Sequence, residues 1–265
     1  HDWASLESIR YIGIGTHLKF YVNEGSSFND VTPIRSTTSA GDVTFSATNG
    51  SSTITATDTS HGATVNDFVT FSGSASLGGN VTAAVLNLEY QIASVPTANT
   101  FTFVAKDSDG NTITANASDS GNGGSSVVGA YQISTGLNTY LEGTGWGADT
   151  FGAGTFGSSS AISSSNQLRL YTQDNFGEDL IFNVRGGGVY YWDESSGTSA
   201  RAVDLSSLSS PSNTPTGALQ VMVSDIDQHV ICFGVNAIGS STIDPLFIRW
   251  SDQESAADWT PTATN

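Results

Sequence analysis

The clearest group of oxygen-bearing side chains is the short acidic segment Asp107-Ser-Asp109-Gly-Asn111. Alternating carboxylate and amide oxygens, with a glycine for the turn, are typical of the start of a calcium-binding loop. The glutamate that closes such a loop at its twelfth position is missing, because Ser118 stands there. An Asp-Gly pair between two strands is also an ordinary hairpin signal. We therefore predict a plain turn, with weak calcium binding by Asp107, Asp109 and Asn111 as the alternative.

A second candidate group lies in residues 224–229. Asp225, Asp227 and His229 would share one face of an extended strand, because side chains alternate with a period of two. Two carboxylates beside a histidine could carry out acid–base chemistry or hold a metal ion. A solvated strand end followed by a turn has the same residues, and we favour that interpretation.

The other reactive side chains form no catalytic constellation. Cys232 is the only cysteine, so the chain can form neither an internal disulfide nor a cysteine-based metal site. His17 and His61 have no partner at ligand spacing. The glycine run 186–188 lacks the Lys-Ser/Thr pair of a phosphate-binding loop. We therefore predict a protein that is not an enzyme and that needs no cofactor.

Two groups of aromatic residues could form an interaction surface. Trp146, Phe151 and Phe156 recur every five residues, each followed by glycine. Glycine permits tight turns, so these rings could line up as a packing surface for another subunit; a hairpin within the chain is the interpretation that we favour. Trp250 and Trp259 form the second group, near the end of the sequence.

Composition and charge narrow the possible functions. The 265 residues include 8 Lys and Arg against 25 Asp and Glu, a net charge of −17. So few cations argue against tight binding to nucleic acid or to anionic membranes. No apolar run approaches the length of a membrane span. The chain starts at His1 without a methionine or a signal segment, and we expect it to be a fragment of a longer polypeptide.

An internal repeat indicates how the elements are organised. Leu168 lies fourteen residues before Phe182, and Leu219 lies fourteen before Phe233. In both copies an aromatic strand ending in tryptophan follows, and residues 12–22 resemble the same unit. The copies that begin at Leu168 and Leu219 start 51 residues apart. A four-stranded propeller blade has a similar length of about 40–50 residues.

The repeat predicts an all-β fold, an incomplete β-propeller of four-stranded blades. Residues 1–39 and 129–265 would supply about three blades, whereas a propeller usually needs 4–8. The remaining blades would lie outside this chain or come from partner subunits. In residues 40–128, Thr, Val, Ile and Phe alternate with polar residues, and no copy of the repeat is present. This segment predicts an inserted small all-β domain, sandwich-like or barrel-like, with residues 119–126 as a flexible exit linker. A β-sandwich with similar strands is the alternative to the propeller.

Several stretches resemble a known family. Residues 28–35 (FNDVTPIR), 224–234 (SDIDQHVICFG) and 248–265 (IRWSDQESAADWTPTATN) resemble the tail nozzle or hub proteins of short-tailed bacteriophages, also called tail tubular protein B. Residues 55–74 and 86–95 resemble a small β-domain often inserted in such tail proteins. Members of that family are much longer than this chain.

The resemblance implies a structural virion protein of the phage tail. Such chains assemble with themselves as a ring, usually a hexamer, beneath an adaptor ring. They contact other tail proteins such as fibres, and DNA passes through their channel without specific binding. An acidic channel wall would repel DNA phosphates. The alternative function is a carbohydrate-binding or glycan-cleaving propeller of a tail fibre or adhesin, in which Trp250, Trp259 and Asp252 would form the sugar site.

Overall fold

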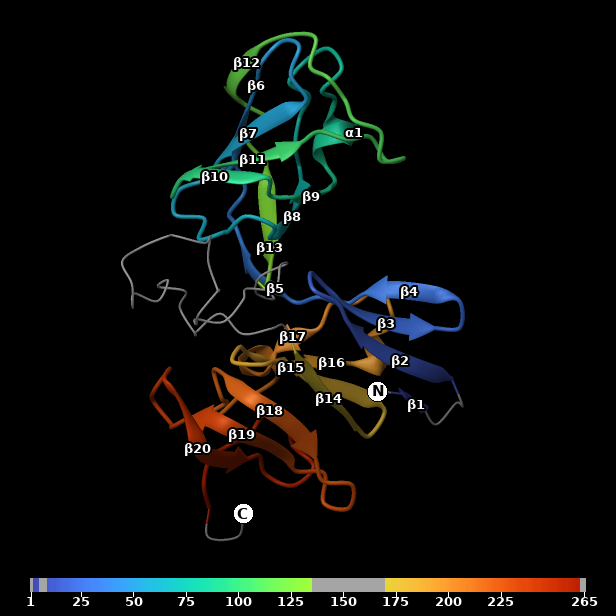
Figure 1. Cartoon of the computed structure of the whole chain (residues 1–265), viewed down its shortest axis with the longest axis vertical. Helices are drawn as coiled ribbons and strands as arrows, with labels where there is room; N and C mark the ends of the chain where they lie inside the picture. Colours follow the sequence, from blue (N-terminus) through green and yellow to red (C-terminus); the bar gives the residue numbers. More distant parts are fainter. Residues whose placement is uncertain (1, 5–8, 135–169, 263–265) are drawn as a thin grey trace, which may run out of the picture. The chain divides into compact units, whose positions relative to one another are not determined.

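The fold is all-β and built from several antiparallel sheets. The computed structural model describes residues 2–4, 9–134 and 170–262, and Figure 1 shows its strands. Threonine, valine and aromatic residues that alternate with polar ones favour strands over helices. Within the described residues the only α-helix is the four-residue α1 (Ala83–Leu86), and no helix there is long and apolar enough to cross a membrane.

The chain divides into two compact units. One, the inserted unit, is residues 33–134; the other, the stacked unit, is residues 1–32 with 135–265. The inserted unit has two sheets, ordered β10-β11-β7-β6-β12 and β5-β13-β8-β9. Their strands are β5 (Ile34–Thr37), β6 (Thr44–Ala47), β7 (Thr53–Thr57), β8 (Phe68–Ser72), β9 (Glu89–Gln91), β10 (Ser94–Thr97), β11 (Thr100–Val104), β12 (Asp119–Asn122) and β13 (Val128–Gln132).

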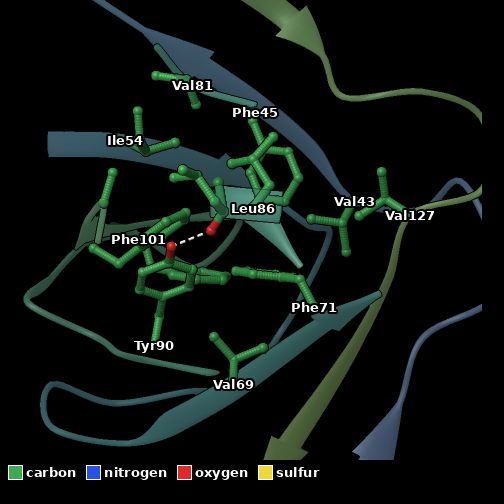
Figure 2. Packing of buried hydrophobic residues seen from close by; sticks show 14 of the residues in the cluster. Val43, Phe45, Ile54, Val69, Phe71, Val81, Leu86, Tyr90, Phe101 and Val127 are labelled. Carbon is green, nitrogen blue, oxygen red and sulfur yellow. Dashed lines mark hydrogen bonds between the residues drawn. The ribbon is translucent and has the colours of Figure 1, made fainter. Parts of the chain in front are cut away.

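The two sheets of the inserted unit enclose one aromatic core. Phe71 of β8 meets Phe45 of β6 edge to face at a centroid distance of 4.9 Å, and Phe103 of β11 lies 5.4 Å from the same Phe71 ring. Figure 2 shows Phe45 and Phe71 pointing toward one another between the sheets, with the Tyr90 hydroxyl donating to the Val85 carbonyl. An edge-to-face pair such as Phe45 with Phe71 stabilises a core beyond the apolar area that it buries.

The ends of the inserted unit lie on neighbouring strands. Ile34 of β5 pairs with Gln132 of β13, and Thr37 pairs with Ala130. The interval 40–128, expected to form an inserted domain, lies inside this unit, and the β5–β13 pairing adds residues at both ends.

The prediction of a flexible linker at residues 119–126 is wrong for the first half of that segment. Residues 119–122 form the edge strand β12, in which Asp119 pairs with Ala47 and Asn122 pairs with Phe45. Pairing to the open edge of β6 satisfies backbone groups that a linker would leave to water. The Gly-rich composition predicted flexibility because composition reflects only local propensity. It does not show that a neighbouring strand is available for pairing.

The stacked unit contains three open antiparallel sheets. Each follows the chain order, so each is a simple meander. The first sheet has β1 (Asp2–Ala4), β2 (Arg10–Gly15), β3 (Phe20–Glu24) and β4 (Ser27–Asp30). The second has β14 (Tyr171–Phe176), β15 (Asp179–Val184), β16 (Val189–Trp192) and β17 (Val203–Asp204). The third has β18 (Ala218–Val223), β19 (Val230–Asn236) and β20 (Ile243–Trp250). No ring of sheets closes within the described residues, so a propeller stays a prediction.

The second sheet is covered on both faces. On one face, Phe182 stacks on Phe20 of the first sheet with ring centroids 3.9 Å apart, and Trp192 meets Trp3 at 6.2 Å. On the other face, Ile181 packs in one cluster with aliphatic side chains of the third sheet and with Cys232. The three sheets therefore stack face to face, with the second sheet in the middle.

The two copies of the repeat pair their tryptophan-ending strand in the same register. Trp192 lies opposite Leu180, two residues before Phe182. Trp250 likewise lies opposite Ile231, two residues before Phe233. The same spacing therefore gives the same pairing in the second and third sheets. Leu168, the first residue of one copy, lies outside the described residues.

The faces of the two copies differ, although the spacing agrees. Phe182 is fully buried against the preceding first sheet, whereas the residue of the third sheet that faces its preceding neighbour is Cys232. Phe233 points the other way and is only half-buried. An offset of one residue reverses the faces of a strand, because side chains alternate.

Candidate functional site

The third sheet has an apolar face that no described residue of the second sheet covers. Val221 and Cys232 pair with each other and point toward the second sheet, so their strand neighbours point away from it. We call this the outer face of the third sheet. Two rows of paired residues cross it, and its apolar members are Met222, Ile231, Phe233, Ile248 and Trp250.

The outer face is partly exposed. Ile248 and Trp250 are each 48% exposed and Met222 is 39% exposed. Met222 lies between the buried Val221 and Val223 of β18, whereas β20 is exposed from residue 244 to its end at 250 except at the buried Arg249. Leu246, 91% exposed, lies beside this face, where the pairing of β19 with β20 becomes irregular. Contiguous exposed apolar residues of this kind mark an interaction surface more often than an ordinary surface.

A pocket of about 280 Å³ adjoins the edge strand β20. Its walls are mostly apolar and are formed by Ile238, Phe247, Ile248, Arg249, Trp250, Trp259 and Pro261. The cationic group among them is already engaged. Arg249 Nη1 donates to the Asn236 carbonyl at 3.2 Å, Nη2 donates to the Asn213 carbonyl, and the guanidinium lies 5.8 Å from the Trp259 ring centroid. Burial lowers the pKa of Arg249 from its ordinary value.

Trp250 and Trp259 reach the same pocket in different roles. Trp259 is 2% exposed, and its indole Nε1 donates to the Ala256 carbonyl at 2.9 Å. Trp250 is the half-exposed one. Asp252 does not line the pocket; its carboxylate accepts the Gln253 amide at 2.9 Å. The two rings and the carboxylate expected for a sugar site therefore do not form one open platform.

The acidic segment at Asp107 has the hydrogen bonding of a turn. The Asp107 Oδ1 atom accepts the amides of Asp109 at 3.0 Å and of Asn111 at 2.8 Å, and Oδ2 accepts the Asn111 side-chain amide at 3.1 Å. These hydrogen bonds, led by the one from the Asn111 side chain, hold the pKa of Asp107 below its ordinary value. Across the described ranges, no group of three or more His, Cys, Asp or Glu could hold a metal ion.

The Asp225, Asp227 and His229 group is not on one strand. Residues 224–229 connect β18 with β19 as a turn, closed by the Ser224 amide, which donates to the His229 carbonyl at 2.9 Å. His229 Nδ1 contacts the Ser251 carbonyl at 2.8 Å. A turn directs successive side chains apart, so these three residues share no face.

The remaining candidates are divided between the core and the undescribed part of the chain. Cys232 is buried, and that burial raises the pKa of its thiol to about 12. His61 is buried in the inserted unit, where its Nδ1 accepts the Ala63 amide at 3.0 Å. Trp146, Phe151 and Phe156 lie outside the described residues, so their predicted surface stays a prediction.

Comparison with known proteins gives no family. No family model matches the sequence, and no curated protein matches it. Among solved structures, the phage phi92 endosialidase is similar over 92% of this chain and 37% of that chain, with 13% sequence identity and a TM-score of 0.27. This chain thus spans little more than a third of that structure, and a similarity this low establishes neither fold nor function.

Sequence reasoning missed most of the outer face. Met222, Ile231, Phe233 and Ile248 were not among the expected surface residues, although Trp250 was. The available signal is that β19 is apolar at consecutive positions, Val230-Ile-Cys-Phe233. A strand that is apolar on both faces needs a neighbour on both faces. Only the sheet arrangement shows which of the two neighbours is supplied by the described residues.

Proposed function

We propose that this chain is a structural protein of a phage tail that works by assembling with other subunits. The observation that carries the proposal is the exposed apolar outer face of the third sheet. The described residues provide no alternative use for it, since the adjoining pocket has an engaged cation and a buried tryptophan. A half-exposed tryptophan in an apolar sheet face suits protein packing.

The phage tail context comes from the sequence. Two of the resembling stretches, residues 224–234 and 248–265, include residues 230–234 of β19 and the end of β20, which form much of the outer face. The finer proposal is a ring around a DNA channel that docks on an adaptor ring and on fibres. A net charge of −17 supports it, because acidic surfaces repel DNA. The glycan-binding alternative has less support, since Trp259 is not available as a stacking platform.

Immunogold electron microscopy of purified phage particles tests the proposal. An antibody raised against the 265-residue chain should label one end of the particle, at the tail. Antibody first absorbed with the purified chain is the control and should leave the particles unlabelled. Detection of the chain only in the infected-cell lysate, with intact and disrupted particles both unlabelled, would overturn a structural role.

A further inference from the structure

The stacked unit exposes apolar faces at both ends of its stack. At one end is the outer face of the third sheet, with Ile248 and Trp250. At the other end is the face of the first sheet that points away from the second sheet, which we call the outer face of the first sheet. There, Ile12 is 43% and Phe28 is 66% exposed. Both residues pair with Asn23, so they lie in one row across that sheet.

The contacts inside the chain show how such faces are covered. Each sheet of the stack has two faces that a neighbouring sheet can cover. The first and second sheets meet through Phe20 and Phe182. The second and third sheets meet through Ile181 and the Val221–Cys232 pair. Among the described residues only the second sheet has both neighbours, and each end sheet has one.

We propose that the outer face of the third sheet packs on the outer face of the first sheet of a second copy. This contact is head to tail and continues the stacking already present within the chain. A contact between two different faces leaves one of each exposed, so it repeats until a ring closes or a filament grows. The inference rests on the proposed assembling role and names the partner as another copy of this chain.

A second copy fits better than a symmetric contact between two third sheets. A symmetric contact would leave the outer face of the first sheet, with Ile12 and Phe28, exposed in both copies. The head-to-tail contact covers one face of each kind. It also joins surfaces of like chemistry, since Ile12 and Phe28 would meet Ile248 and Trp250.

The attraction must come from apolar burial, because the copies repel. Each carries a net charge of −17, and salt screens such repulsion between surfaces. We therefore expect self-association of the purified chain to strengthen as sodium chloride is added. A contact dominated by surface ion pairs would weaken under the same conditions.

Sedimentation velocity of the 265-residue chain over a wide range of concentration tests the contact. The chain should form dimers and larger species as its concentration rises. Ile248→Asp should weaken this association about tenfold or more, since it buries an unpaired carboxylate at the contact. Val65→Asp is the matched control, because Val65 is 50% exposed in the inserted unit, and it should associate like the original chain. A chain that stays monomeric throughout, or Ile248→Asp with unchanged association, would overturn the proposal.

A mixing experiment tests the direction of the contact. Phe28→Asp should also weaken association, through the other face. Each variant keeps one intact face, so a mixture of Ile248→Asp and Phe28→Asp should form dimers that grow no further. A mixture that stays monomeric would overturn the head-to-tail contact. If Ile248→Asp does not fold, as judged by circular dichroism, Met222→Glu replaces it on the same face.

The results separate this inference from the proposed function. If the antibody labels the tail but the purified chain does not self-associate, the proposed contact is refuted and the structural role stands. Self-association of a chain that is absent from particles would do the reverse.

Discussion

Cys232 shows what burial does to a reactive group. The thiol lies on β19 among aliphatic side chains between the second and third sheets and is fully buried. Burial raises its pKa to about 12, and the nearby Arg249 charge offsets only part of that effect. Because the folded pKa lies above the ordinary value near 8.5, this thiol adds stability below about pH 8.5 that is lost as pH rises toward 12.

We predict that Cys232 does not react with a thiol reagent such as DTNB in the folded chain at pH 8. An unperturbed cysteine would be about a quarter thiolate at that pH. Labelling should become complete on adding denaturant, with a rate in native buffer set by unfolding of the stacked unit. Val65→Cys provides an internal control, because its half-exposed thiol should label rapidly in the same sample. Rapid labelling of both thiols would contradict the buried position of Cys232.

At the scale of elements, Asp30 joins the first sheet to the segment before β17. Its carboxylate accepts Lys19 Nζ at 2.7 Å and Arg201 Nη1 at 2.8 Å, and it also accepts the Thr32 hydroxyl at 2.6 Å. Burial by itself would raise the pKa of Asp30, but the hydrogen bonds from Lys19 and Thr32 outweigh it and hold the pKa below the ordinary value. The charged form is therefore stabilised by folding.

We predict that Asp30→Asn lowers the free energy of unfolding of the stacked unit by about 1–2 kcal/mol at pH 7. A lowered folded pKa stabilises the native state above the ordinary value near 4, and this contribution is lost as pH falls through the folded pKa. The difference between the two chains should therefore shrink toward pH 3. Urea unfolding followed by tryptophan fluorescence measures it, and Asp225→Asn, in the β18–β19 turn, is the control. An equal difference at pH 7 and pH 3 would contradict the role of the charge.

At the scale of the whole molecule, the two units have separate cores. The inserted unit has its own cluster of buried residues, including Phe45, Phe71 and Phe101, and its ends pair through β5 and β13. None of the five tryptophans lies in residues 33–134. Tryptophan fluorescence therefore reports on the rest of the chain, while circular dichroism reports on both units.

We predict that residues 33–134 fold when expressed alone. The fragment should show the circular dichroism of β-structure and one cooperative thermal transition, because its core and its end-to-end pairing are both internal. Phe71→Ala should lower the stability of the fragment by about 3–5 kcal/mol, the usual cost of removing a buried phenylalanine. A fragment without a cooperative transition would show that the inserted unit depends on the stacked unit.

The strands and several of the turns follow from local sequence patterns. The sequence predicted an all-β domain over residues 40–128, and the structure confirms the all-β fold, with strands such as β7 and β11 in that interval. The turn expected at Asp107 depends on atoms within a few residues of it, as does the turn at residues 224–229. Local patterns carry such information, because the backbone and its near neighbours decide them.

Which faces of the strands are covered depends on the packing of sheets that are far apart in the sequence. Phe182 and Phe233 have the same spacing in the sequence, yet one is buried by the first sheet and the other lies on the outer face. Trp250 and Trp259 looked like one aromatic pair, but Trp259 is buried beneath Arg249 and Trp250 is half-exposed. Residues 119–122 joined a sheet because the edge of β6 was open to them. Burial depends on segments far apart in the sequence, and a one-residue change of register reverses it, so local patterns do not determine it.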